Sequence, residues 1–243
     1  MKFKERTPKI TFIANQEGLT LDTSIHPKPA REFIPSWWKK MPSKIERLDT
    51  VSKFRNGKTI RLCPSFAHWF SKGYVLPAWA DITLKYDEEN EIWSWTCGGV
   101  DSIYKIEIHG LEQFLSHVTE QYQGEKGSFV FKLISPWNII TSRGWSVMQL
   151  PMWFHFNHEW SVMPGILDTD IHHGINQQIV YYGKGKEIFI PKGTPLVHYV
   201  PFKRKEAKMG IREMTARDKL RFAGNILMFT SKNTGGYNSM KRD

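Results

Sequence analysis

The stretch that decides the fold runs from residue 135 to residue 204. It reads SPWNIITSRGWSVM at 135–148, PGILDTD at 164–170 and IFIPKGTPLVHYVPF at 188–202. Apolar, β-branched and aromatic residues come in short runs that Gly, Pro, Asn and Asp separate, which predicts consecutive antiparallel strands. Five of the nine histidines lie in the same stretch, which makes it the first candidate for a functional site.

The same alternation extends toward the N-terminus and predicts more strands. The clearest is a hairpin, in which residues 81–86 and 91–97 alternate on either side of a polar turn. Further strands are expected at residues 9–13, 59–63, 102–108 and 127–134.

Helical patterns occur between and after these strands. Ser36 is a candidate N-cap for a short helix that ends before Pro42, and Pro64 fits the first position of a second helix. Apolar residues recur at helical spacing over 111–122, and Thr215 opens a basic C-terminal helix with a capping-box pattern. The sequence therefore predicts a mainly β fold, an antiparallel β-sandwich or jelly roll with a few peripheral helices, including a C-terminal helix.

The domain organisation follows from the length. A chain of 243 residues can bury a full core, and no internal repeat or low-complexity linker divides it. We expect a single β-rich domain in three parts: an N-terminal strand and irregular wrap at 1–58, a β core at 59–204, and a basic C-terminal helix and tail at 205–243.

The net charge of +10 is concentrated near the C-terminus, where residues 184–243 carry +9 of it. A basic region of this kind suggests an acidic partner, although a solvated basic face is an equally simple interpretation. Eight residues are candidates for partner binding: Lys203, Arg204, Lys205, Lys208, Arg212, Arg217, Lys219 and Arg221. Interleaved with Tyr199 and Phe202, they could also hold phosphates and stack a base, but no base-reading motif is present.

Composition argues against several classes of protein. No apolar run approaches the roughly 20 residues that span a bilayer, so no membrane insertion is expected. The first residues are basic without an apolar segment, so no secretory signal is expected. Cys63 and Cys97 are the only cysteines, which fits a reducing compartment and excludes the spacing of a structural zinc site.

The strongest candidate for a metal site consists of Asp170, His172 and His198. Non-haem iron oxygenases use two histidines and one carboxylate, and Asp170 and His172 would share one face of a strand. Downstream, Pro191 and Gly193 resemble the second turn motif of cupins, but His198 follows the Gly at a longer spacing than a cupin ligand. A polar loop between strands is the alternative interpretation of residues 168–176.

A second histidine cluster is less suited to metal binding. His155, His158 and Glu159 would share a face on a helix, but the aromatic residues around them favour a strand or an irregular loop. On a strand, the two histidines would point to opposite sides.

The opening stretch contains three short motifs: PWN at 136–138, GILDTD at 165–170, and KGTP at 192–195 with Pro201 beyond. Together they resemble an uncharacterised family of tailed-phage and bacterial proteins, known as a domain of unknown function. The match covers about 70 residues, 135–204, and departs from the family at Ile171, where a Trp is usual. The resemblance implies a phage or bacterial source and no particular activity.

Three hypotheses about function follow. The first is a non-catalytic structural or assembly protein of a tailed phage, virion-associated or in the cytoplasm of the infected bacterium, which meets other phage structural proteins and possible copies of itself. The second is a cupin-like metal-dependent enzyme with Fe(II) on Asp170, His172 and His198. The third is a nucleic-acid-binding protein that uses the basic C-terminal region.

Overall fold

The computed structural model describes residues 9–44, 59–87, 89–90, 92–98, 106–109, 113, 117, 129–182 and 187–230, without the side chains of 129 and 224–230. The chain divides into two compact units, Met1–Arg204 and Lys205–Asp243. The division coincides with the predicted start of the basic C-terminal region.

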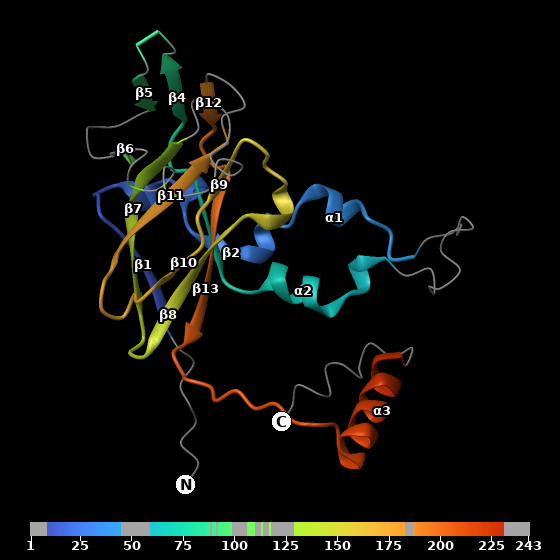
Figure 1. Cartoon of the computed structure of the whole chain (residues 1–243). Helices are drawn as coiled ribbons and strands as arrows, with labels where there is room; N and C mark the ends of the chain where they lie inside the picture. The colour runs from blue at the N-terminus through green and yellow to red at the C-terminus, as the bar shows by residue number, and fades with distance from the viewer. Residues whose placement is uncertain are drawn as a thin grey trace. The chain divides into compact units, whose positions relative to one another are not determined.

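The first sheet of the larger unit is built around one long strand. This strand, β7, pairs on one side with β11, which pairs in turn with β9; on its other side it pairs with β6 near its start and with β1 near its end. All of these pairings are antiparallel (Figure 1). The strands are β1 (Ile10–Ala14), β6 (Ile106–His109), β7 (Phe129–Thr141), β9 (Trp160–Val162) and β11 (Gly174–Tyr181).

A second antiparallel sheet has the strand order β10-β8-β13-β3-β2, and a third has the order β12-β4-β5. The third sheet contains the predicted hairpin, β4 with β5, which is confirmed. The strands are β2 (Lys28–Pro29), β3 (Tyr74–Pro77), β4 (Ile82–Asp87), β5 (Ile92–Cys97), β8 (Trp145–Pro151), β10 (Gly165–Leu167), β12 (Glu187–Ile190) and β13 (Pro195–Lys203).

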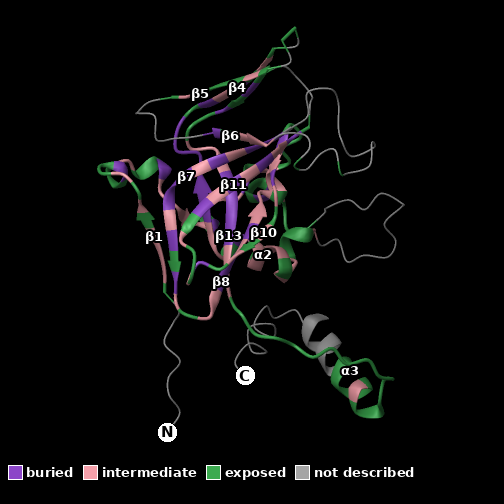
Figure 2. Cartoon of the chain, turned by 60° about the vertical axis from the view of Figure 1, so that its left-hand side comes forward, coloured by how far each residue is buried: buried purple, intermediate pink, exposed green. Residues whose placement is uncertain are grey.

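The three sheets enclose one apolar core, to which Phe131, Ile139, Val147, Ile82 and Ile188 all contribute. Alternate residues along β11 and β12 are buried, as strand geometry requires for a sheet with one face inward, whereas β13 buries residues 196–199 in succession. Figure 2 shows these buried positions along β7, β11 and β13. The predicted antiparallel, sandwich-like β fold is therefore confirmed.

A buried polar link crosses the core between the first two sheets. Gln177 on β11 donates from Nε2 to the hydroxyl of Tyr199 on β13 at 2.7 Å, and that hydroxyl donates to Gln149 Oε1 on β8 at 3.3 Å. All three side chains are buried, and burial raises the pKa of Tyr199. Because buried polar groups need partners, this link fixes how the two sheets face each other.

Short helices cover one side of the sandwich. Helix α2 starts at Pro64, as predicted, and ends before Gly73, which has a φ of 76° and approaches β13 so closely that a Cβ there would lie 2.1 Å from the Tyr199 carbonyl oxygen. The helices are η1 (Leu19–Leu21), η2 (Thr23–Ile25), η3 (Ala30–Phe33), α1 (Ser36–Lys40), η5 (Ile60–Leu62), α2 (Pro64–Ser71) and η9 (Trp153–His155).

The prediction of a strand at 59–63 is wrong, because this segment forms the 3-10 helix η5. The Thr59 hydroxyl accepts a hydrogen bond from the Arg61 N–H at 3.3 Å and donates to the Pro42 carbonyl at 2.6 Å. Arg61 in turn donates to the carbonyls of Lys39 and Met41, both at 2.6 Å, at the end of α1. Contacts with a segment about 20 residues away therefore override the local strand pattern.

The turn at Pro191 and Gly193 is confirmed, since the Thr194 N–H donates to the Pro191 carbonyl at 3.0 Å and Gly193 has a φ of 84°. Ser36 is the first residue of α1 rather than its cap, which is Pro35. The predicted helix over 111–122 lies outside the described residues except for 113 and 117.

The C-terminal unit contains helix α3 (Ala216–Thr230), and its predicted capping box is confirmed. The Asp218 N–H donates to the Thr215 hydroxyl at 3.3 Å, while the Thr215 N–H donates to the Asp218 carboxylate at 3.0 Å. Arg212 pairs with the same carboxylate, and these contacts lower the pKa of Asp218. Among the described residues, no helix has both the length and the apolarity to cross a membrane.

Candidate functional site

Asp170, the first predicted metal ligand, is engaged by Arg204. The guanidinium makes a bidentate contact, with Nη1 2.7 Å from Oδ1 and Nη2 2.6 Å from Oδ2, and the Gly144 N–H donates to Oδ2 at 2.7 Å. These hydrogen bonds lower the pKa of Asp170 to about 2. Ser146 and Asp168 complete the network, because Arg204 also reaches Ser146 Oγ at 2.9 Å and Asp168 at 3.0 Å.

The contacts of Arg204 with Asp168 and Asp170 have a structural role. Arg204 is the last residue of the larger unit and follows β13, whereas Asp168 and Asp170 follow β10. Bidentate arginine–carboxylate pairs are geometrically specific, so the pair joins two strand ends of one sheet. The carboxylate oxygens of Asp170 already have partners, which leaves this residue poorly suited to bind a metal.

His198 lies in different surroundings from Asp170, whereas His172 lies in the same loop. His198 is 3% exposed on β13, its Nε2 is 2.6 Å from the Lys72 carbonyl, and its ring meets the Trp69 ring edge-on at 5.1 Å. Burial lowers the pKa of His198. His172 is exposed in the loop before β11. Within the described part of the chain, no three His, Cys, Asp or Glu side chains come together in a way that could hold a metal ion.

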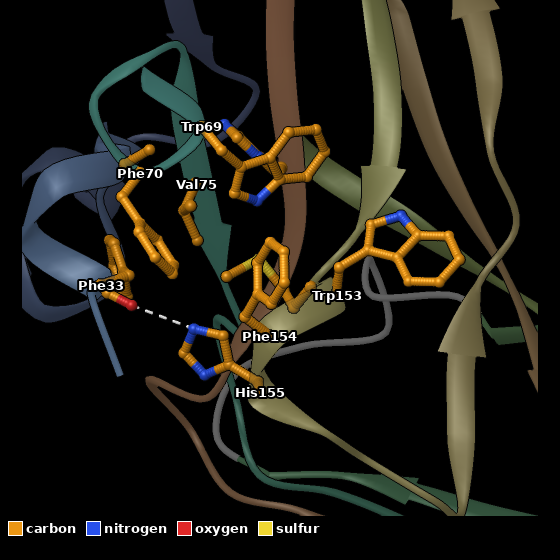
Figure 3. A pocket seen from close by; sticks show the side chains of 10 residues that line it. Phe33, Trp69, Phe70, Val75, Trp153, Phe154 and His155 are labelled. Carbon is orange, nitrogen blue, oxygen red and sulfur yellow. Dashed lines mark hydrogen bonds between the residues drawn. The ribbon is translucent and has the colours of Figure 1, made fainter. Parts of the chain in front are cut away.

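The second histidine cluster lies in a loop. The aromatic residues around it predicted either a strand or an irregular loop, and the loop is the conformation observed. His155 ends η9 and its Nε2 lies 3.0 Å from the Phe33 carbonyl, as Figure 3 shows. Burial lowers the pKa of His155. His158 is exposed, and the Asn157 side chain accepts from the N–H groups of Glu159 and Trp160, at 2.9 Å and 3.2 Å. This loop therefore orders its own backbone and does not gather its two histidines.

Aromatic side chains fill the space between this loop and the helices. Phe154 meets the rings of Phe66 and Phe70 at 5.1 Å and 5.4 Å, and its carbonyl accepts from Trp37 Nε1 at 2.9 Å. The loop with η9 lies between the sandwich and helix α1 (Figure 1). In Figure 3 the ring of Trp153 points away from Phe154 and His155. The cluster thus holds the loop firmly and leaves Trp153 turned outward.

On the outer side of this loop lies a groove of about 860 Å³, which sequence reasoning missed. Its aromatic lining comes from Trp153, Phe156, Trp160 and Tyr182. Trp153, Phe156 and Trp160 have the spacing of one helix face, but the segment forms only the short helix η9 and a loop, so the periodicity gave no signal of the groove. A concave, mostly apolar site of this volume falls in the range of ligand pockets.

The eight predicted partner-binding residues divide between the two units. Lys203 and Arg204 belong to the larger unit, where Arg204 is held by Asp168 and Asp170. The others belong to the C-terminal unit, where all are exposed and Arg212 pairs with Asp218. These exposed residues are Lys205, Lys208, Arg212, Arg217, Lys219 and Arg221.

Large apolar side chains accompany the cations of the C-terminal unit. Met209, Ile211 and Leu220 are 87%, 88% and 77% exposed, and Met214 and Phe222 are also exposed. All of the described residues from 205 to 223 are exposed except Asp218, which is partly exposed. The segment therefore offers both positive charge and apolar area to a partner.

No protein-family model matches the chain, and no curated protein matches it.

Proposed function

We propose that this protein is a non-catalytic assembly protein, virion-associated in a tailed phage, whose C-terminal unit docks on an acidic protein partner. The observation that carries the proposal is the exposed segment at 205–223, in which Lys and Arg alternate with Met209, Ile211 and Leu220. The phage source rests on the resemblance of residues 135–204 to the tailed-phage family.

The composition of this segment favours a protein partner. Burial of exposed apolar side chains supplies affinity, while complementary charge speeds association and selects the partner. Nucleic acid would engage the cations through its phosphates, but it would leave side chains such as Ile211 and Leu220 in water. The apolar residues therefore distinguish the assembly proposal from the nucleic-acid alternative.

The larger unit supports a non-catalytic role in a more limited way. Two of the predicted site residues in this unit, Asp170 and His198, have structural partners in Arg204 and the Lys72 carbonyl. No described contact favours the iron-enzyme hypothesis over the assembly proposal, so the iron enzyme stays an untested alternative.

The proposal is tested by incorporation into particles of the encoding phage. A charge variant carries Lys205→Gln, Lys208→Gln and Lys219→Gln, and its control carries Lys39→Gln, Lys40→Gln and Lys44→Gln, three exposed lysines of the larger unit. An apolar variant carries Met209→Ser and Ile211→Ser, and its control carries Leu21→Ser and Ile171→Ser, which are also exposed. Purified particles are assayed for the protein by quantitative mass spectrometry.

We expect both C-terminal variants to lower incorporation by about tenfold or more, since they remove charge steering or apolar contact area. Both controls should match the wild type. Unchanged incorporation of both C-terminal variants contradicts the proposal. Loss in the charge variant alone, together with DNA binding that weakens steeply with salt, favours the nucleic-acid alternative.

A further inference from the structure

The groove described above lies over the outer face of the first sheet. Ser161 on β9 and Val180 on β11 are opposite each other in the antiparallel ladder, and both line the groove. Each is half-buried between two fully buried neighbours, so the two side chains point away from the core. Residues from the segments 151–158 and 194–195 add further lining. The groove is therefore a surface site whose side chains can meet a ligand.

Three aromatic side chains of the lining stay open to solvent. Trp153, Phe156 and Tyr182 are 62%, 57% and 40% exposed. In the part of the chain that the structure describes, the rings of Trp153 and Tyr182 contact no other aromatic ring, and Figure 3 shows the Trp153 ring turned away from its neighbours. These rings are therefore available as contact surfaces for a ligand.

The loop that carries Phe156 is held in place by its own contacts. Phe156 has a φ of 51°, the single positive value among the described residues other than glycine. The next residue, Asn157, accepts from the N–H groups of Glu159 and Trp160, and the Tyr182 N–H donates to the Glu159 carbonyl at 2.9 Å. Because these contacts form without a ligand, binding here loses little conformational entropy.

Neutral polar groups accompany the aromatic rings. The Asn157 amide nitrogen, the His158 imidazole and the hydroxyls of Tyr182 and Thr194 belong to residues that line the groove. Within the described residues, none of these four groups has a hydrogen-bond partner. Amide, imidazole and hydroxyl groups can bond to the hydroxyls of a ligand. The groove therefore offers both flat apolar surfaces and unused hydrogen-bonding groups.

The lining also defines the charge of the ligand. None of the described residues that line the groove is Lys, Arg, Asp or Glu, although these four residue types make up 24% of the chain. An ionic ligand would lose water here without gaining an opposite charge. Nucleic acid, in particular, depends on cations along its phosphates. A neutral ligand therefore fits this groove better than an ionic one.

We propose that this groove binds a neutral oligosaccharide. A pyranose ring carries C–H groups on its faces and hydroxyls around its edge. The C–H faces stack on Trp153 and Tyr182, because weakly positive hydrogens are attracted to the negative face of an aromatic ring. The hydroxyls form hydrogen bonds with Asn157 and Thr194. This site lies in the larger unit and does not depend on the docking of the C-terminal unit proposed above.

The first experiment measures binding of the full-length protein to an array of neutral oligosaccharides and of the same sugars bearing carboxylate or sulfate groups. We expect binding to members of the neutral set, and binding weaker by about tenfold or more to their charged counterparts. Each hit is measured again in solution by calorimetry with the free sugar. A protein that binds none of the neutral sugars, or binds the charged ones as tightly, overturns the proposal.

The second experiment places the bound sugar in the groove. Trp153→Ala should weaken binding about tenfold or more, because aromatic anchors dominate such contacts. Trp95→Ala is the matched control, since Trp95 is 43% exposed but does not line the groove, and it should leave binding unchanged. Asn157→Asp keeps an oxygen that accepts from the loop N–H groups but removes the amide donors, so it should weaken binding about threefold to tenfold. Equal affinities of all three variants contradict the proposal.

The third experiment leaves the protein unaltered and changes the sugar. Analogues of the tightest-binding sugar, each lacking one hydroxyl, are measured by the same calorimetry. Loss of a hydroxyl that bonds to the groove should weaken binding about threefold or more, whereas loss of one that faces water should not. Indifference to every deoxygenation, or binding that requires an added alkyl chain, would identify a groove for apolar ligands and overturn the proposal.

Discussion

Gly73 lies against Tyr199, so close that a Cβ on the glycine would stand 2.1 Å from the tyrosine carbonyl oxygen. The residue also has a φ of 76°, in the left-handed region that favours glycine. This contact places the end of the helical layer directly on β13, the strand that carries His198 and ends beside Arg204. Strand β13 therefore contacts the end of the helical layer and carries the buried His198. It ends at Lys203, one residue before the end of the larger unit.

The first prediction compares two glycines of similar conformation. Gly144 has a φ of 77° but nothing within 4 Å of its Cβ position, so Gly144→Ala should cost about 1–2 kcal/mol for the left-handed backbone alone. Gly73→Ala should cost clearly more, because the backbone of β13 must also move. Urea unfolding of the two variants measures the difference. Equal costs would show that the close approach to Tyr199 is absent.

The second prediction concerns the buried link between the sheets. Tyr199→Phe removes the hydroxyl that accepts from Gln177, and the stranded amide should cost about 1–3 kcal/mol. Gln177→Met should restore part of this stability in the double variant, because it removes the unsatisfied donor. A double-mutant cycle in urea measures the coupling. Additive effects of the two substitutions would contradict the hydrogen bond.

The third prediction concerns acid. The pKa of Asp170 is lowered to about 2, below its unfolded value near 4, so its contribution to stability is complete above about pH 4 and is lost as the pH falls toward 2. Thermal unfolding between pH 5 and pH 2 should show this loss, and Asp170→Asn should flatten the profile in that window. A variant with the wild-type slope would indicate that other carboxylates cause the acid sensitivity.

The fourth prediction concerns the buried His198 and the half-buried His155. Burial lowers the pKa of His155 and His198, so the unfolded chain binds more protons than the folded one below about pH 6.5. Stability should therefore rise with pH up to that value and level off above it. His198→Gln and His155→Gln should each reduce the slope between pH 5 and pH 6.5 in denaturant unfolding. His172→Gln serves as the control, since His172 is exposed.

The sequence predicted those parts of the fold whose causes are local. The β4–β5 hairpin follows from alternation around a polar turn, and α3 begins at a capping box whose two partners are three residues apart. The strand wrongly expected at 59–63 shows the opposite case. There, Arg61 donates hydrogen bonds to carbonyls at the end of α1, and the pattern of residues 59–63 does not predict a contact with that distant segment.

The candidate sites depended still more on distant contacts. Asp170 and His172 were grouped because strand spacing would align them, yet Asp170 meets Arg204 and His198 meets the carbonyl of Lys72, 126 residues away in sequence. The groove could not be predicted at all, because its lining combines residues between 151 and 164 with residues 180, 182, 194 and 195, which only the folded chain brings together. The exposed cations of the C-terminal unit could be predicted, since they need no tertiary contact.

The most direct test of the central claim, docking of the C-terminal unit on an acidic protein, is lysine cross-linking of purified particles followed by mass spectrometry. The account predicts cross-links from Lys205, Lys208 or Lys219 to one structural protein of the particle, with linked sites in its acidic regions. Their absence, in particles that contain the protein and show cross-links from Lys39 or Lys40 instead, would contradict it.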